Sequence, residues 1–204
     1  MRKLFLLAVF AFSFIEMQAQ EVFFTTGTNF TRYNYTNSKG ESNPNLKSGQ
    51  GLFFEIGYAT PFEDDRFKYS VALSLNGYNA VGGTTASNYS WDTNFLGVKN
   101  NLSFKMFDSN KFDISANGGL TFSSMIYGRQ TINGTYYNLS EQKEFAGLWI
   151  APSMGVQAKC IITRDINLSL GYNLIKNFNT SNGSPEKLSF TTNQLQFGIH
   201  LELY

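Results

Sequence analysis

The sequence is poor in the residues that build most catalytic and metal sites, because its 204 residues include one Cys and one His. A single Cys excludes an internal disulfide, and with a single His it argues against a zinc site, so we expect no metal and no cofactor. Charged residues make up only 15% of the chain, against about 25% in soluble domains. The net charge of +1 argues against nucleic-acid binding, which needs a basic surface.

Long apolar runs are also absent after the first twenty residues. Arg2 and Lys3 precede the run LFLLAVFAFSFI at residues 4–15, and Ala19 offers a small residue at a cleavage site. This order is typical of a secretory signal peptide, and the run is too short for a spanning helix. We therefore expect a cleaved signal peptide at residues 1–19 and a single mature domain at residues 20–204. Any membrane insertion of the mature chain would have to use strands.

The mature chain is rich in aromatic residues, with 20 Phe and 11 Tyr, and apolar residues recur at every second position. In the clearest segment, Phe67, Val71 and Leu73 share one face of a strand, and Lys68 and Ser70 share the other. Alternation with period two predicts strands. Eight such segments occur, at residues 22–35, 52–59, 67–76, 96–106, 112–122, 148–159, 166–174 and 194–203.

The connections between these segments alternate in length. Polar links at residues 36–50, 79–90, 128–144 and 177–189 are long, whereas those at 61–66, 108–111 and 163–165 are short. This alternation is expected of an antiparallel up-and-down meander with one tight end. The predicted fold class is therefore all-β, an eight-stranded antiparallel barrel that follows a cleaved signal peptide.

The residue types on the two faces favour a transmembrane barrel over a soluble one. The polar face consists mostly of small uncharged residues with few charges, as suits a narrow closed interior, and the other face is almost uninterrupted Leu, Ile, Val, Phe and Tyr, as suits lipid. Aromatic residues at both ends of the strands are expected of belts at the membrane interfaces: Phe62, Phe67, Phe107 and Phe112 at one end, and Tyr78, Tyr89, Trp91, Tyr127 and Phe178 at the other. A soluble exported barrel that binds an apolar ligand stays as an alternative.

Two residues conflict with this pattern. Pro152 lies inside a predicted strand, where it cannot donate a ladder hydrogen bond, so it is a candidate for a β-bulge. Asn100 falls on the face assigned to lipid, where an amide is costly.

The signal peptide, the eight alternating segments, the loop lengths and the terminal strand LQFGIHLELY together resemble the small eight-stranded outer-membrane β-barrel proteins of Gram-negative bacteria. The resemblance covers the mature chain. It implies a location in the cell outer membrane, with the long loops outside the cell and the short turns and both termini in the periplasm. It does not imply one function, because related folds serve adhesion, anchoring and lipid modification.

The inward face carries the candidate interior polar network. Its members are the ionisable residues of the polar parity: Glu55, Lys68, Lys99, Lys105, Asp113, Lys159, His200 and Glu202. His200 is the one imidazole, and Glu202 lies two residues further along the same face, so that the pair could orient a general base. A structural, hydrogen-bonded His is the favoured interpretation, and we predict no catalytic residue.

An eight-stranded barrel has an interior filled by side chains, so we predict that the chain is not an open pore. The expected function is non-enzymatic, with a structural or interaction role through the long extracellular loops; a lipid- or glycan-modifying barrel enzyme is the alternative. The loop at 128–144 is the candidate partner-binding surface because Tyr and Arg are common interface anchors. Its residues are Arg129, Tyr136, Tyr137, Glu141 and Lys143. The expected partners are outer-membrane lipid and another envelope protein or external ligand.

Overall fold

The protein is described by a computed structural model that covers residues 20–41, 46–62, 66–84, 87–140, 142–180 and 187–203. The signal peptide expected at residues 1–19 lies outside the described residues. Ten strands follow in chain order: β1 (Gln20–Thr36), β2 (Leu46–Phe62), β3 (Phe67–Gly77), β4 (Ala80–Thr84), β5 (Ser87–Asp108), β6 (Phe112–Ile132), β7 (Thr135–Asn138), β8 (Trp149–Ile161), β9 (Ile166–Asn179) and β10 (Lys187–Leu203). Among these residues, no helix is long and apolar enough to cross a membrane.

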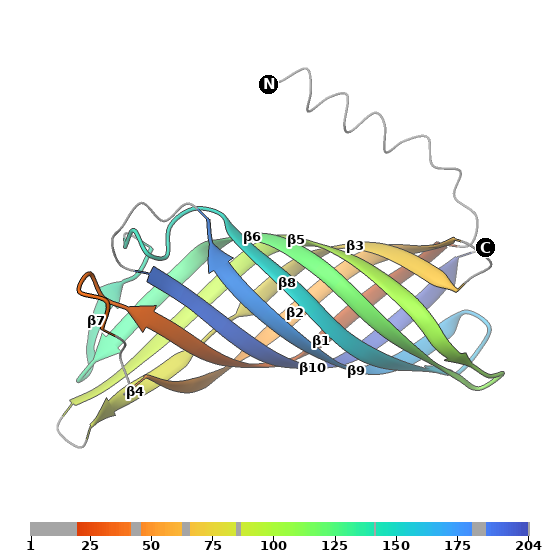
Figure 1. Cartoon of the computed structure of the whole chain (residues 1–204). Coiled ribbons are helices and arrows are strands. Elements are labelled where there is room, and N and C mark those ends of the chain that lie inside the picture. Colours follow the sequence, from red (N-terminus) through yellow and green to blue (C-terminus); the bar gives the residue numbers. More distant parts are fainter. Residues whose placement is uncertain are drawn as a thin grey trace.

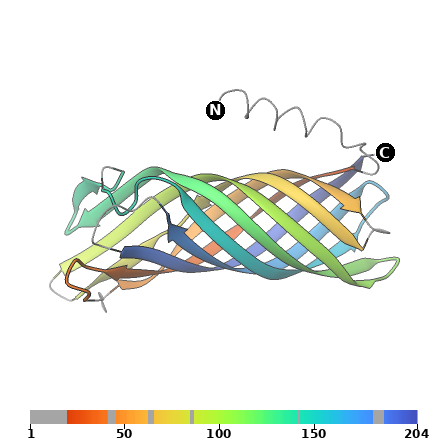
Figure 2. The same cartoon turned by 45° about the horizontal axis from the view of Figure 1, so that its top comes forward.

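Eight of the strands close into an antiparallel ring in the order β1, β2, β3, β5, β6, β8, β9 and β10 (Figure 1). Closure depends on the pairing of the first and last strands, whose register runs from Gln20↔Leu203 to Thr36↔Lys187. Because every wall strand has a neighbour on both sides, the ring has no open edge. The predicted up-and-down barrel is therefore confirmed, and Figure 2 shows the same closed wall after rotation.

One end of the barrel is more regular than the sequence predicts. The segments expected to be long loops contribute strand residues: β2 begins at Leu46, β6 continues to Ile132, and β10 begins at Lys187. In addition, β4 inserts between β2 and β5 beyond the end of β3, and β7 folds back onto β6 (Figure 1). Strands therefore extend further into the polar links predicted at 79–90 and 128–144 than the sequence indicates, because backbone pairing with neighbouring strands continues beyond the apolar alternation.

The two faces of the wall are as predicted. Leu52, Leu73 and Leu195 point outward with 62%, 53% and 52% of their surface exposed. On the opposite parity, Glu55 and Gln194 point inward and are buried. An uncovered apolar surface of this extent requires an apolar surrounding, since soluble proteins rarely expose large contiguous apolar patches.

The two residues that conflict with the pattern are accommodated differently. The hydroxyl of Tyr69 on β3 donates to Asn100 Oδ1 at 2.7 Å, so the amide on the outer wall has a partner. Pro152 points outward, and the register of β8 against β9 is the same before and after it. The expectation of a bulge at Pro152 was wrong. Register shifts lie instead between β5 and β6, at Asn94/Phe95 and Lys105/Phe107.

The aromatic residues separate into an outer belt and an inner cluster. At the end with the short turns, Phe62 stacks on Phe67 at 5.6 Å between ring centroids, and Phe107 stacks on Phe112 at 5.3 Å. At the other end, Tyr127 and Phe178 lie on the outer surface as expected. The assignment of Tyr78, Tyr89 and Trp91 to that outer belt was wrong, because they pack with the apolar cluster inside the barrel.

Candidate functional site

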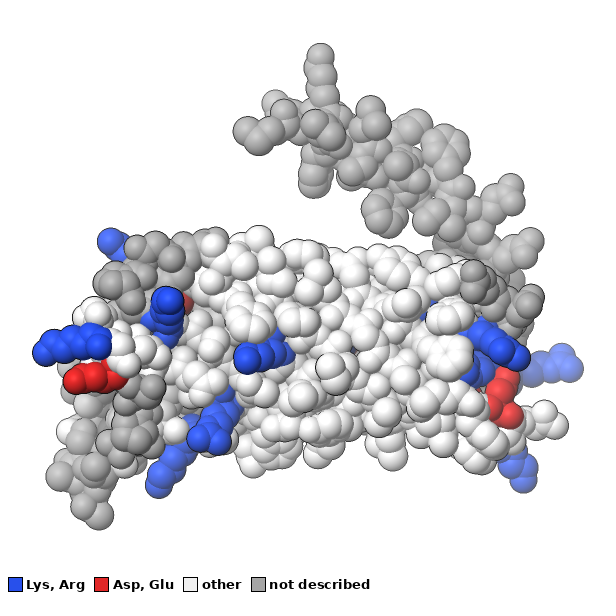
Figure 3. Space-filling view, in the orientation of Figure 1, with Lys and Arg blue, Asp and Glu red and all other residues white. Residues whose placement is uncertain are grey.

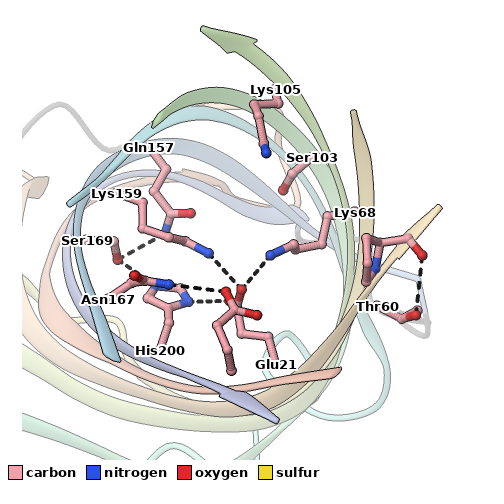
Figure 4. A network of polar contacts seen from close by, with 12 residues as sticks. Glu21, Thr60, Lys68, Ser103, Lys105, Gln157, Lys159, Asn167, Ser169 and His200 are labelled. Atoms are coloured by element: carbon pink, nitrogen blue, oxygen red, sulfur yellow. Dashed lines mark hydrogen bonds and ion pairs between the residues drawn. The ribbon is translucent and has the colours of Figure 1, made fainter. Parts of the chain in front are cut away.

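A cluster of ionisable side chains in the interior surrounds the carboxylate of Glu21 on β1. Lys68 Nζ lies 2.5 Å and Lys159 Nζ 2.7 Å from Glu21 Oε2. His200 Nδ1 lies 2.5 Å from the other oxygen, Oε1. Figure 4 shows the two lysines and the imidazole converging on Glu21 from β3, β8 and β10. Glu21 is 2% exposed, so three donors satisfy a charge that burial would otherwise make costly.

His200 also reaches a serine. Its Nε2 atom lies 2.8 Å from the Oγ atom of Ser169 on β9, and Gln157 Nε2 donates to the same Oγ at 3.2 Å. With Nδ1 donating to Glu21, Nε2 accepts from the Ser169 hydroxyl. The serine, imidazole and carboxylate thus lie in the order found in nucleophilic triads.

The expected pairing of His200 with Glu202 was wrong. Residues two apart on a strand share a face but are separated by nearly 7 Å along it. The strand register places Glu21 opposite Glu202 and Phe23 opposite His200, so Glu21 is the diagonal neighbour of the imidazole. Glu202 instead accepts a hydrogen bond from Asn167 Nδ2 at 3.1 Å.

Glu21 was not among the predicted network residues. A signal for it exists in the sequence, because Glu21 shares its parity with Thr25, Asn29 and Thr31, all of which are buried in the interior. The blurred alternation of the first strand hid that parity.

A second ion pair lies in the same interior. Lys99 Nζ is 3.0 Å from both carboxylate oxygens of Glu55, and Thr25 Oγ1 donates to Glu55 Oε2 at 3.3 Å. Between this pair and the Glu21 cluster is a cavity of about 90 Å³, room for a few water molecules. Asp113 and Lys105 line its side toward the short turns.

Lys105 does not join the buried network. Its Nζ atom lies 3.1 Å from Asp108 Oδ2, three residues away and near the β5–β6 turn. Of the predicted network, Lys68, Lys159 and His200 share one carboxylate, and Glu55 and Lys99 form a separate pair.

The opposite half of the interior is closed by an apolar plug. Its buried members are Tyr33, Leu46, Tyr78, Ala80, Phe95, Leu139, Phe145, Trp149, Leu188 and Phe190. Phe190 lies at its centre, with ring centroids 4.6 Å from Tyr33, 4.7 Å from Tyr78 and 5.1 Å from Trp149. Two of these rings are hydrogen-bonded to the backbone: the Tyr33 hydroxyl donates to the Tyr78 carbonyl and Trp149 Nε1 to the Phe145 carbonyl, both at 3.0 Å.

The predicted binding loop is a β-hairpin. Asn133 and Gly134 both have positive φ, 48° and 84°, as a two-residue type I′ turn requires, and they join β6 to β7. This Asn-Gly pair is the sequence signal that could have predicted the hairpin. Tyr136 and Tyr137 are 66% and 50% exposed.

Contacts at its base hold the hairpin against the barrel rim. The Arg129 guanidinium lies 5.0 Å from the centre of the Tyr136 ring, and its Nη2 lies 3.4 Å from Asp92 Oδ2. A shallow groove of about 410 Å³ runs beside the two tyrosines. Lys143 is exposed further along the chain, and Glu141 lies outside the described residues.

The family follows from a comparison with known sequences. Residues 4–201 match the model of the outer membrane protein beta-barrel domain. The chain belongs to this family. The protein is therefore an outer membrane β-barrel whose apolar wall faces the membrane. The alternative of a soluble exported barrel does not apply.

The solved structures to which this outer membrane barrel is similar share little sequence with it. Neisserial surface protein A is 13% identical, with a TM-score of 0.46, over 91% of this chain and 99% of that one. Ail of Yersinia pestis is 9% identical, with a TM-score of 0.41, over 88% and 97%. The outer membrane protease OmpT of Escherichia coli is 6% identical, with a TM-score of 0.45, over 92% and 98%. No curated protein matches the sequence.

Proposed function

We propose that this outer membrane barrel is a non-enzymatic interaction protein that presents the β6–β7 hairpin to a partner outside the cell. The observation that carries the proposal is the exposure of Tyr136 and Tyr137 on a hairpin held by Arg129. Exposed aromatic side chains on a preorganised support supply contact area at low entropic cost. Together with the groove beside them, they suit an envelope protein or an external ligand.

The interior supports an anchoring role rather than solute passage. The plug around Phe190 fills one half of the barrel, and the cavity near Glu21 has room for only a few waters. An open aqueous channel needs a barrel of about 16 strands. Because the described side chains fill the interior, we expect a partner to bind at the outer surface of the hairpin end.

The proposed orientation places β4, β7 and the long connections outside the cell and the short turns in the periplasm. It can be tested in a Cys160→Ser background with Tyr137→Cys or Lys111→Cys. A membrane-impermeant maleimide should label position 137 in intact cells, and position 111 only after the outer membrane is permeabilised. The reverse labelling would show that the orientation is wrong.

The partner can be tested by mild detergent extraction followed by quantitative mass spectrometry. We expect a component that copurifies with the wild type and is lost from the Tyr136→Ala/Tyr137→Ala variant. Tyr172→Ala, which removes a tyrosine from the outer wall, is the matched control and should retain it. Identical copurifying components in all three proteins would contradict the proposal.

Hydrolysis by a serine nucleophile is a second candidate function, favoured by the Ser169–His200–Glu21 arrangement. Burial argues against it, since Ser169 is 2% and His200 4% exposed, and the neighbouring backbone N–H groups belong to the β9–β10 ladder. An oxyanion would thus lack the donors that acyl transfer needs. Treatment with a small sulfonyl fluoride distinguishes the two candidate functions. A covalent adduct at Ser169 that forms in the wild type and not in His200→Ala would favour the hydrolase. No adduct at Ser169 in the wild type would favour the interaction protein.

A further inference from the structure

Three basic side chains lie on the outer wall and share the parity that carries the apolar residues nearer the middle of the barrel. Arg32 on β1, Lys176 on β9 and Lys187 on β10 are all exposed and share the outward parity of their strands. These three residues are called the basic wall patch. Figure 3 shows basic side chains on the barrel wall toward the end that carries β4 and β7, and a broad uncharged surface toward the middle.

The strand register brings two members of the patch together. Arg32 is paired with Thr191, and Thr191 with Lys176, so the three residues form one lateral row across β1, β10 and β9. Neighbouring strands are about 4.8 Å apart, which places the Arg32 and Lys176 backbones roughly 10 Å apart. Their long side chains can therefore reach one anion between them. Lys187 lies on β10, four residues from Thr191 in the direction of the long connections.

The next row on the side of the barrel centre is where the apolar wall begins. It consists of Phe30, Asn193 and Leu174, and the row after it of Thr28, Leu195 and Tyr172. The Tyr172 hydroxyl donates to Asn193 Oδ1 at 2.5 Å, so the carbonyl of the one amide side chain in these rows has a partner. The basic wall patch thus lies where an apolar surface meets a charged one, at the height where lipid acyl chains would give way to headgroups.

No Asp or Glu of the described residues forms an ion pair with any of the three. Lys176 lies 5.3 Å from the centre of the Phe178 ring, which holds its ammonium against the wall. Cations on a lipid-facing parity are costly unless an anion compensates them. An anion supplied by the surrounding membrane would do so.

We propose that the basic wall patch binds the phosphate groups of an anionic glycolipid, of the lipid A type, in the outer leaflet. Arg32 offers two parallel N–H donors to phosphate oxygens, and Lys176 and Lys187 add point charges. The acyl chains of the same lipid pack on the apolar rows that contain Phe30, Leu174 and Leu195. The proposal rests on the orientation given under the proposed function, and it names a lipid rather than free phosphate because the patch adjoins the apolar wall.

The test uses purified full-length protein in detergent micelles and native mass spectrometry of bound lipid A. Basic residues at an anionic membrane surface each strengthen association. We therefore expect Arg32→Gln/Lys176→Gln/Lys187→Gln to weaken lipid A retention by at least about tenfold. Dephosphorylated lipid should bind the wild type as weakly as lipid A binds the variant, and inorganic phosphate should not displace bound lipid A.

The matched control removes the same charge elsewhere. Lys39, Lys111 and Lys143 are exposed outside the patch, and Lys39→Gln/Lys111→Gln/Lys143→Gln should retain lipid A within about twofold of the wild type. Heat-dependent gel migration verifies that both variants are folded barrels. Equal retention by the patch variant and the wild type, or displacement by inorganic phosphate, would overturn the proposal.

These outcomes are independent of the proposed partner. The Tyr136→Ala/Tyr137→Ala variant should retain lipid A, because the hairpin lies outside the patch. A detergent micelle does not separate two compartments. Lipid retention measured in micelles therefore does not depend on the orientation of the barrel in the cell. Reversed maleimide labelling together with patch-dependent retention would overturn the outer-leaflet assignment and leave phosphate recognition standing.

Discussion

His200 Nδ1 lies 2.5 Å from Glu21 Oε1, although 179 positions separate the two residues in the sequence. The contact exists because β1 and β10, the first and last strands, pair with each other to close the barrel. Lys68 and Lys159 complete the surroundings of the same carboxylate from β3 and β8. Glu21 thus connects four strands from around the ring.

Glu21→Gln should lower the free energy of unfolding, because it leaves the ammonium groups of Lys68 and Lys159 without their carboxylate. Breaking a buried ion pair by removing one partner costs about 3–5 kcal/mol. Urea unfolding in lipid vesicles would measure the change. Asp108→Asn, which breaks the more exposed pair with Lys105, should cost less than about 1 kcal/mol; equal effects of the two variants would contradict a central role for Glu21.

Gly198→Ala should disrupt the contact between Ser169 and His200. A Cβ atom at Gly198 would lie 2.4 Å from Ser169 Oγ and 3.0 Å from His200 Nε2. Such overpacking costs about 1–3 kcal/mol, measurable by the same urea unfolding. Gly118→Ala is the control, since the atom nearest to a Cβ at Gly118 is the Ser153 carbonyl oxygen at 3.9 Å. If Gly118→Ala lowers the free energy of unfolding as much as Gly198→Ala does, the crowding explanation is wrong.

Phe190→Ala should destabilise the barrel by removing the centre of the plug. Truncation of a buried Phe costs about 3–5 kcal/mol through lost burial and the cavity left behind. Phe197 on the same strand faces outward and is 43% exposed, so Phe197→Ala should cost less. The comparison of the two urea midpoints checks this prediction, which fails if the outer residue is the more sensitive one.

Tyr69→Phe should be destabilising only while Asn100 is present. Loss of the hydroxyl leaves Asn100 Oδ1 without its donor on the outer wall, and an unpaired buried acceptor costs about 1–3 kcal/mol. In an Asn100→Leu background the same substitution should be close to neutral. A double-mutant cycle measures the coupling, and a coupling energy near zero would show that the pair contributes nothing.

Much of the wall could be predicted from the sequence because one physical rule governs it. Side chains on a strand alternate between two faces, so Leu52, Leu73 and Leu195 had to share one environment and Glu55 and Gln194 the other. The same parity placed Lys99, Lys159 and His200 inside. The hairpin of β6 and β7 was missed because residues 128–138 show no regular alternation of apolar and polar side chains, although Asn133-Gly134 was a usable turn signal.

The partners of the interior residues could not be predicted, because they depend on strand register and on closure of the ring. The sequence favoured a His200–Glu202 pair because the two residues are neighbours on one face of the same strand. The register of β1 against β10 instead makes Glu21 the diagonal neighbour of His200. Tyr78 and Trp91 have the composition of an interface belt but pack inside the barrel with the plug. Composition alone does not distinguish these locations.

The sequence by itself determined the alternating strands, their number around the barrel and the side of each strand that meets lipid, since all three follow from local periodicity. Only the tertiary structure decided which charges share Glu21, where the plug closes the interior and that Arg32 and Lys176 lie in one row. Those relationships join strands that are distant in sequence, and only the register of a closed sheet brings them together.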